Sequence, residues 1–184
     1  MRNRVSYIRS TATQIRRILL FFGGIDLSDE TSKSLDALEL VGASELSVDV
    51  ILGANNLCRR KIQNRLAGRR NYRCLVQVDN MAEFMATAQL SIGAGGTASW
   101  ERLAMGLPAI VMSVAPNQTQ GCTHLSRTRH HFYLGESSSV SVKDLKFAIE
   151  ERLRAPAETL ACGIRGMKFV DGLGCTRIAK ALSN

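Results

Sequence analysis

The chain has 184 residues, 45% hydrophobic and 22% charged, a composition that suits one well-buried soluble domain and argues against disorder, a coiled coil or two full domains. No apolar run approaches the roughly 18 residues that a membrane span needs, and the basic N-terminus lacks a small-residue cleavage site, so we expect a cytoplasmic protein with no membrane span. The formal charge of +8 suits an anionic partner, but aromatic residues make up only 5% and do not interleave with the basic clusters, which argues against nucleic acid.

Residues 1–16 are basic and polar with no convincing period, which indicates a basic arm or linker remnant ahead of a domain at 17–184. The apolar run 17–22 ends in Gly23-Gly24 and suits a strand buried on both faces of a parallel sheet. A helix then begins at 28–30, with a buried stripe of Leu35, Leu38 and Val41. This strand, glycine turn and helix form a candidate phosphate loop, although the same glycines also suit a plain helix-capping turn.

Two more strand and helix pairs follow. Residues 47–53 alternate and then run apolar as a strand would, and the helix 57–66 comes after them. Residues 72–78 are the third expected strand, which leads into a short helix capped by Asp79 or Asn80.

The clearest strand, turn and helix lie within residues 89–108. An apolar run leads into three glycines within four residues, Gly93 to Gly96, and apolar residues then recur at helical spacing, namely Trp100, Leu103, Ala104 and Leu107. Glycines let a ligand approach the backbone, and the first free amides of a helix attract an anion, above all a phosphate. We expect the amides of Gly95, Gly96 and Thr97 to bind it, and the Glu101 carboxylate to accept from neutral hydroxyls such as those of a ribose. A plain turn with an N-cap at Thr97 and a solvated Glu101 is the alternative.

The rest of the chain continues the alternation. A strand at 109–114 precedes Pro116-Asn117-Gln118, which begins a helix to about Arg129, and a short strand at 131–134 follows. Residues 139–154 are the clearest amphipathic helix, with Val142, Leu145, Ile149 and Leu153 on one face. The pattern predicts an α/β fold with a single Rossmann-like, doubly wound parallel sheet, whose ligand belongs at the carboxyl ends of the strands.

Several of these motifs together resemble a known family. They are similar to the C-terminal, nucleotide-sugar-binding domain of the GT-B fold, in the branch of MurG-like glycosyltransferases and, closer still, of PseG-like UDP-sugar hydrolases of pseudaminic acid biosynthesis. The segments that carry the resemblance are Gly23–Asp26, Ile92–Thr97, Trp100–Arg102, Gly106–Pro108, Asn117-Gln118 and Asp171–Ile178.

The resemblance implies the C-terminal half of a GT-B fold, with UDP or a UDP-sugar as its partner. The backbone near Val78 would contact the uracil ring. The implied nucleotide-sugar-binding residues are Gly23, Gly24, Asp26, Val78, Gly95, Gly96, Thr97, Glu101, Asn117 and Gln118.

A catalytic residue is missing from this picture. In the hydrolase family a histidine on a glycine-rich turn of the N-terminal half acts on the sugar–phosphate bond, and nothing here matches it. The histidines present are His124, His130 and His131, all in expected helix or strand. We identify no catalytic residue beyond a supporting role for Asn117, and expect the isolated chain to be inactive or nearly so. It would be a fragment of a longer enzyme, half of a split protein with a separate N-terminal catalytic domain, or a decayed copy.

Three functions stay open: a hydrolase part in bacterial surface-glycan biosynthesis of the pseudaminic acid type, a MurG-like transferase domain, and a non-catalytic nucleotide-sugar-binding module. Asn117-Gln118 matches the hydrolase pattern, whereas MurG-like transferases tend to carry a histidine-containing loop before their glutamine. We therefore favour the hydrolase.

Other chemistries lack their motifs. The sequence has no P-loop, no Gly-x-Ser-x-Gly elbow and no dinucleotide fingerprint with its distant acid, so we expect no cofactor. The five cysteines are widely spaced without a Cys-x-x-Cys pair, so we expect reduced thiols and no metal site.

Overall fold

A computed structural model describes residues 14–42 and 44–183. Its strands are β1 (Arg17–Phe21), β2 (Ser47–Leu52), β3 (Tyr72–Val76), β4 (Leu90–Ala94), β5 (Ala109–Ser113) and β6 (Phe132–Glu136). All pair in parallel in one sheet, in the order β3-β2-β1-β4-β5-β6. From β1 the chain adds β2 and β3 on one side of the sheet, and then β4, β5 and β6 on the other side of β1. The strand order therefore reverses between β1 and β4, which is where a doubly wound sheet binds its ligand. The predicted fold class is confirmed.

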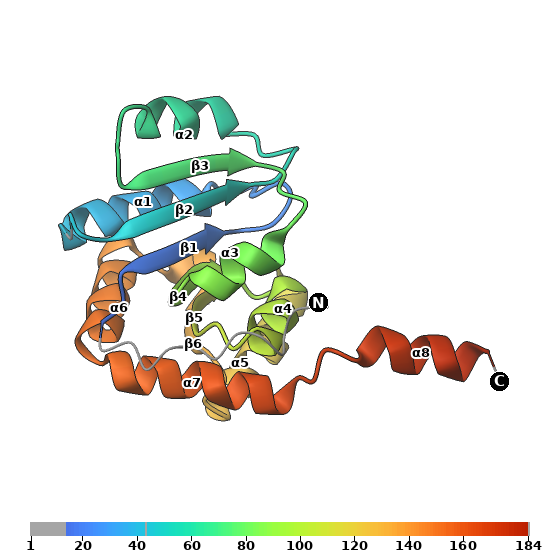
Figure 1. Cartoon of the computed structure of the whole chain (residues 1–184). Coiled ribbons are helices and arrows are strands. Elements are labelled where there is room, and N and C mark those ends of the chain that lie inside the picture. Colours follow the sequence, from blue (N-terminus) through green and yellow to red (C-terminus); the bar gives the residue numbers. More distant parts are fainter. Residues whose placement is uncertain (1–13, 43, 184) are drawn as a thin grey trace.

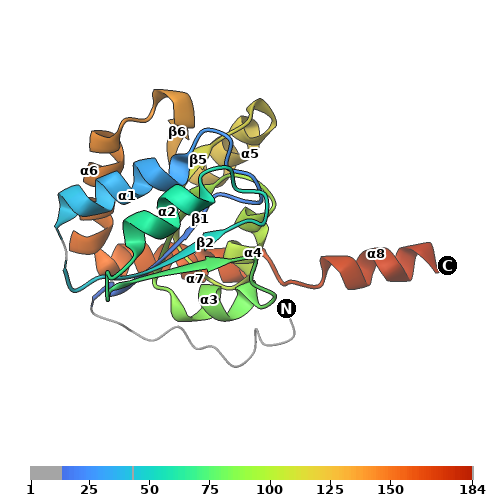
Figure 2. The same ribbon diagram turned by 90° about the horizontal axis from the view of Figure 1, so that it is seen from above.

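Helices cover both faces of this sheet (Figures 1 and 2). They are α1 (Glu30–Val41), α2 (Arg59–Leu66), α3 (Met81–Thr87), α4 (Ala98–Ala104), α5 (Pro116–Arg127), α6 (Val142–Arg154), α7 (Pro156–Phe169) and α8 (Gly174–Leu182), with a 3-10 turn, η2, at Ser137–Ser139. Side chains alternate between the faces of a strand. Ile18 and Leu20 of β1 therefore join the cluster that includes α1, α2 and α6, whereas Leu19 joins the cluster with α3.

The strand sequences explain their positions in the sheet. Every residue of β4 and β5 is buried, as the continuous apolar runs predict for strands covered on both faces. Strand β3 lies at the sheet edge and is only partly buried. Strands β1, β2, β3 and β5 end one or two residues earlier than the sequence predicts, because the residues that follow turn toward the next helix. Strand β4 instead continues through Gly93 to Ala94, and β6 ends at Glu136, two residues later than predicted.

The start of the chain is a partial correction. Residues 1–13 of the predicted arm lie outside the described residues. Residues 14–16, in contrast, are attached to the domain: the side-chain amide of Gln89 accepts from the Arg16 amide at 2.7 Å and donates to the Gln14 carbonyl at 2.9 Å. Ile15 belongs to the core. The described part of the predicted arm is thus packed.

Helix α7 was not predicted from the sequence; it begins with Pro156 and contains two glycines. The glycines are packing positions. A Cβ on Gly163 would lie 2.2 Å from the Gly106 carbonyl oxygen, and one on Gly166 would lie 2.8 Å from a Leu103 methyl. They let α7 approach α4 closely. Beyond α7, helix α8 projects away from the sheet (Figure 1) and buries none of its residues.

Candidate functional site

The predicted site residues follow the carboxyl ends of β1, β3, β4 and β5, and the structure brings the last two groups into contact. A Cβ on Gly96 would lie 3.4 Å from the Gln118 Nε2 atom. Gln118 also accepts from the Val114 amide through Oε1 at 3.0 Å, so it joins the end of β5 to the turn after β4. Asn117 is exposed beside it, and its side chain has no hydrogen bond to another described residue. The Gly95–Thr97 turn and Asn117-Gln118 thus form one edge.

The turn after β4 has a different amide pattern from the predicted one. The Gly95 N–H donates to the Met112 carbonyl at 3.0 Å, because the pairing of β4 with β5 continues one residue past Ala94. Its predicted role as a phosphate donor is therefore wrong. The N–H groups of Gly96, Thr97 and Ala98 have no acceptor among the described residues, as expected where a helix begins. Three consecutive amides are free at this point.

Neither Gly95 nor Gly96 has a positive φ, so the turn does not need glycine for its backbone angles. Gly95 is required for close packing, because its Cβ would lie 2.0 Å from the Cys122 sulfur on α5. Gly96 leaves the surface in front of the amides open. The glycines therefore bring a helix and a strand end together and keep the free amides accessible.

Two polar side chains stand beside these amides. Thr97 occupies the N-cap position of α4, but it is in the helical region at φ −54° and its hydroxyl makes no capping bond, so the simple N-cap alternative does not describe it. Glu101, in the first turn of α4, is partly exposed and has no ion pair or hydrogen bond within the described chain. Both side chains are free to meet a ligand.

The apolar stripe predicted for α4 is partly wrong. Trp100 is 49% exposed, whereas Arg102 is 2% exposed. Arg102 Nη2 donates to the Ala94 carbonyl at 2.6 Å and to the Ser99 hydroxyl at 2.9 Å. Burial lowers the pKa of Arg102 to about 10. The small residues on β4 make this possible, since a Cβ on Gly93 would lie 2.8 Å from Arg102 Nη1. These small residues are the sequence feature that could have indicated a buried arginine.

The turn after β1 is organised by Asp26. This residue has φ 53°, and its carboxylate accepts from the Glu30 amide at 2.9 Å, the Thr31 amide at 3.0 Å and the Thr31 hydroxyl at 2.6 Å. Both oxygens are engaged at the start of α1, whose N-cap residue is Asp29. Gly23 has φ 91°, a backbone conformation that suits glycine, while Gly24 is exposed. The structure gives Asp26 a role in shaping the turn, next to two glycines whose backbone is accessible.

The remaining predicted contact, Val78, lies after β3 and packs with the cluster around α3. Gln77 just before it has φ 48°, and its N–H donates to the Leu52 carbonyl at 2.9 Å. The chain therefore turns sharply at the carboxyl end of β3. Asn80 is at the N-cap position of α3, one of the two predicted positions, but its side chain makes no capping hydrogen bond.

None of the histidines has a catalytic environment. His131 is buried, its Nε2 lies 2.9 Å from the Cys122 carbonyl oxygen, and burial lowers its pKa to about 4, so it is a neutral core residue that donates to a carbonyl. His130 stacks on Phe169, with ring centroids 4.5 Å apart. His124 is exposed on α5.

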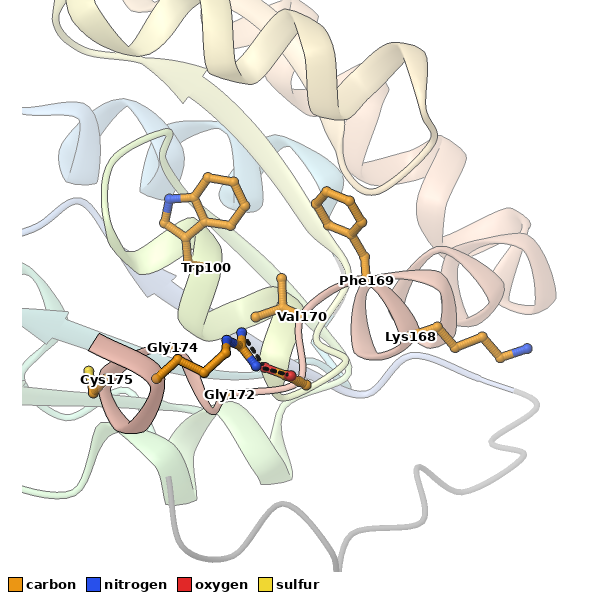
Figure 3. Close-up of a pocket in the computed structure, with 9 residues that line it drawn as sticks. Trp100, Lys168, Phe169, Val170, Gly172, Gly174 and Cys175 are labelled. Carbon is orange, nitrogen blue, oxygen red and sulfur yellow. Dashed lines mark hydrogen bonds and ion pairs between the residues drawn. The ribbon is translucent and has the colours of Figure 1, made fainter. Parts of the chain in front are cut away.

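A separate hollow of about 550 Å³ lies between α4 and the segment that joins α7 to α8. Figure 3 shows Trp100 and Phe169 on opposite sides of it, with Val170 between them. An ion pair between Asp171 and Arg177 contributes to its lining. The exposed indole of Trp100 thus belongs to the wall of a surface hollow.

Part of the positive charge is neutralised within the chain. On α2 and the following loop, Lys61 pairs with Asp29 at 2.8 Å, Arg65 with Glu39 at 3.0 Å, and Arg69 also with Glu39. These partners belong to α1 or its cap. The basic clusters at 59–61 and 69–70 are therefore partly ion-paired.

All five cysteines are free thiols. Among residues 14–42 and 44–183, no group of three or more His, Cys, Asp or Glu side chains is arranged to hold a metal ion. Within the same ranges no helix is both long and apolar enough to cross a membrane.

Comparison with known proteins identifies two relatives in sequence. The chain is 24% identical over 170 residues to the spore coat polysaccharide biosynthesis protein SpsG of Bacillus subtilis, covering 92% of this chain and 50% of that one. It is 27% identical to protein MJ1062 of Methanocaldococcus jannaschii, over 79% of this chain and 32% of that one. The chain thus spans half, or less, of the length of these relatives.

Solved structures show the same fold. Acinetobacter baumannii MurG matches with a TM-score of 0.69 at 14% identity, over 95% of this chain and 54% of that one. A complex of the spinosyn rhamnosyltransferase SpnG with thymidine diphosphate has a TM-score of 0.69 at 16% identity, over 94% and 46%. The Staphylococcus aureus MnaA–UDP structure has a TM-score of 0.71 at 13% identity, over 90% and 45%.

The family itself follows from the sequence comparison. The model of the glycosyltransferase family 28 C-terminal domain matches residues 18–124, which run from the second residue of β1 through β5 and most of α5. The closer resemblance to PseG-like hydrolases is not confirmed by these comparisons, which agree with the MurG-like branch. Because the match covers more than half of the chain, the chain belongs to the glycosyltransferase family 28 C-terminal domain family.

Proposed function

We propose that this domain binds the nucleotide-sugar donor of a MurG-like glycosyltransferase, with UDP as the nucleotide. The observation that carries the proposal is the row of free amides at Gly96, Thr97 and Ala98, placed at the carboxyl end of β4 beside the unpaired Glu101 carboxylate. Backbone N–H groups at the start of a helix favour phosphate oxygens, and a carboxylate favours neutral hydroxyls. The diphosphate would lie on the amides and the ribose on Glu101.

The adjoining residues suit the other parts of a nucleotide sugar. The exposed backbone of Gly24 and the amide of Asn117 flank the turn on the neighbouring strand ends, where a sugar attached to the diphosphate would extend. The backbone near Val78 is the proposed contact of the uracil ring. The free Thr97 hydroxyl adds a donor for a phosphate oxygen. This arrangement takes the ligand along the carboxyl edge of the sheet.

The similar proteins support this class of ligand. MnaA was solved with UDP, and SpnG with thymidine diphosphate, so nucleoside diphosphates occur on domains of this fold. SpsG is named for polysaccharide biosynthesis. We accordingly propose that the donor serves the synthesis of a polysaccharide or other surface glycan.

In such a reaction this domain would stabilise the leaving group. As the bond between the sugar and the diphosphate breaks, negative charge grows on the diphosphate, and preorganised N–H donors stabilise that charge. The described residues offer no base or acid for the opposite side of the sugar, and proton transfer and orientation together contribute several orders of magnitude in rate. We propose that an N-terminal catalytic half supplies them and that this chain alone turns over a UDP-sugar at most in traces.

A hydrolase of the PseG-like type is the second candidate. Asn117 supports it, because its exposed side-chain amide has no partner among the described residues and precedes Gln118, which meets the glycine turn; there it could orient a water molecule or the sugar. The two candidates differ in the acceptor. When an N-terminal half is supplied, a transferase gives a glycosylated product, whereas a hydrolase releases free sugar or sugar phosphate.

Isothermal titration with UDP, thymidine diphosphate and uridine tests the proposal. We expect UDP to bind at micromolar to millimolar concentration, and uridine far more weakly, because the amides act on the phosphates. No heat and no thermal shift at millimolar UDP would contradict the proposal. Tighter binding of thymidine diphosphate than of UDP would retain the site and change the nucleotide.

A further inference from the structure

Arg102 is a buried cation beneath the proposed phosphate turn. It extends from the last part of α4 back to the end of β4, and only 2% of its surface is exposed. No described carboxylate forms an ion pair with it. Burying a charge without a counter-ion is costly, so the position of this guanidinium calls for a physical reason.

Its hydrogen bonds enclose the turn. One nitrogen, Nη2, donates both to the Ala94 carbonyl, which precedes the turn, and to the Ser99 hydroxyl, in the first turn of the helix that follows. Gly95 to Ala98 lie between these two partners. Arg102 therefore joins the two ends of the segment that presents the free amides, and it fixes their separation.

The remaining guanidinium atoms are unsatisfied. Arg102 Nε and Nη1 are buried and have no hydrogen-bond partner. A guanidinium in this state keeps much of its positive field, because no carboxylate among the described residues forms an ion pair with it, and the Glu101 carboxylate acts on it only through space. An anion on the neighbouring amides would be attracted by that field and would, in return, offset the cost of the buried charge.

We propose that Arg102 is the positioning residue of the phosphate site, which holds the turn between Ala94 and Ser99 and supplies the internal positive charge that balances a bound diphosphate. This inference rests on the proposed nucleotide function. It assigns a role to a side chain that the ligand never touches, and it predicts that the phosphate part of the affinity depends on this arginine.

The test compares Arg102→Lys, Arg102→Gln and Arg102→Met in binding to UDP, UMP and uridine. We expect the Met and Gln variants to lose about tenfold or more in UDP affinity, less in UMP affinity, and to keep their uridine affinity. The Lys variant, which keeps the charge without the fork of donors, should fall between these variants and the wild type. A merely structural residue would give no such dependence on charge.

Arg152 is the matched control. It is also a buried arginine, 9% exposed, but it lies over the Phe132 ring at 4.1 Å and pairs with Glu151 and Glu158. Arg152→Met should lower stability and leave the ratio of UDP to uridine affinity unchanged. Two results would overturn the charge role of Arg102. One is a loss of UDP affinity in Arg102→Lys as large as that in Arg102→Met, and the other is Arg102→Gln binding UDP as tightly as the wild type.

A measurement on the unmodified protein covers the case in which the variants do not fold. The Nε–H resonance of Arg102 in a ¹⁵N spectrum should shift on addition of UDP and stay in place with uridine. If UDP binds and this resonance does not move, the inference fails and the proposed function stands. If UDP does not bind the wild type, the proposed function itself fails.

Discussion

Gly95 and Cys122 lie in direct contact where β4 meets α5, so that a Cβ added to Gly95 would stand 2.0 Å from the Cys122 sulfur. Cys122 is 1% exposed and has no room to withdraw. The neighbouring Gly96 differs, since its Cβ would meet only the Gln118 amide at 3.4 Å. Two consecutive glycines thus have distinct functions, one in packing and one in access.

We expect Gly95→Ala to lower the free energy of unfolding by about 1–3 kcal/mol, as overpacking does, and to weaken UDP binding by shifting the turn. Gly96→Ala should change stability by less than about 1 kcal/mol. Chemical denaturation and calorimetry check both. The double variant Gly95→Ala, Cys122→Ala should recover part of the loss, and a double variant no more stable than Gly95→Ala would contradict the contact.

Glu101 should be needed for the ribose. Its carboxylate is unpaired in the described chain, so Glu101→Ala removes a ligand contact without breaking an internal hydrogen bond or ion pair. We expect about a tenfold loss of UDP affinity, the range of a hydrogen bond to a charged acceptor, with no loss of stability. The control is Glu83→Ala, which removes an exposed carboxylate on α3. Equal UDP affinity in Glu101→Ala and wild type would remove the role of Glu101 and leave the phosphate site intact.

Asp26 should matter for stability more than for binding. Because its carboxylate accepts from the Glu30 and Thr31 amides at the start of α1 and from the Thr31 hydroxyl, we expect Asp26→Ala to cost about 1–3 kcal/mol in the free energy of unfolding. Asp26→Asn should cost less, since asparagine accepts a cap bond and tolerates a positive φ. Titration of the folded variants should give UDP affinities within about threefold of wild type. A large loss of UDP affinity in a variant of unchanged stability would show instead that Asp26 contacts the ligand.

His131 should make the protein less stable in acid. Its pKa is about 4 in the folded chain against about 6.5 when unfolded, so the unfolded chain takes up the proton first as pH falls. Its contribution is complete above pH 6.5 and declines by roughly 3 kcal/mol as pH falls to about 4. His131→Gln should flatten the pH dependence of unfolding between these values, while His124→Gln on the exposed surface of α5 should not. If the free energy of unfolding has the same pH dependence in the wild type and in His131→Gln, the role of His131 is contradicted.

The sequence predicted what depends on local pattern. The strands, the turn at Gly95–Thr97 and the meeting of the site residues at one sheet edge follow from apolar runs and glycine spacing. What it missed depends on contacts between distant residues. The Gly95 amide is taken by Met112 through strand register, and Arg102 is buried because Gly93 leaves space for it. Helix α4 has only seven residues, too few for periodicity to decide whether Trp100 or Arg102 faces inward.

The measurement that tests the central claim most directly is a titration of ¹⁵N-labelled protein with UDP, followed through the backbone amide resonances. We predict the largest shifts at Gly96, Thr97 and Ala98, a small shift at Gly95, whose N–H is already bonded to Met112, and much smaller shifts at all of these with uridine. The largest shifts at the basic residues 59–61, or no shifts at millimolar UDP, would contradict the account.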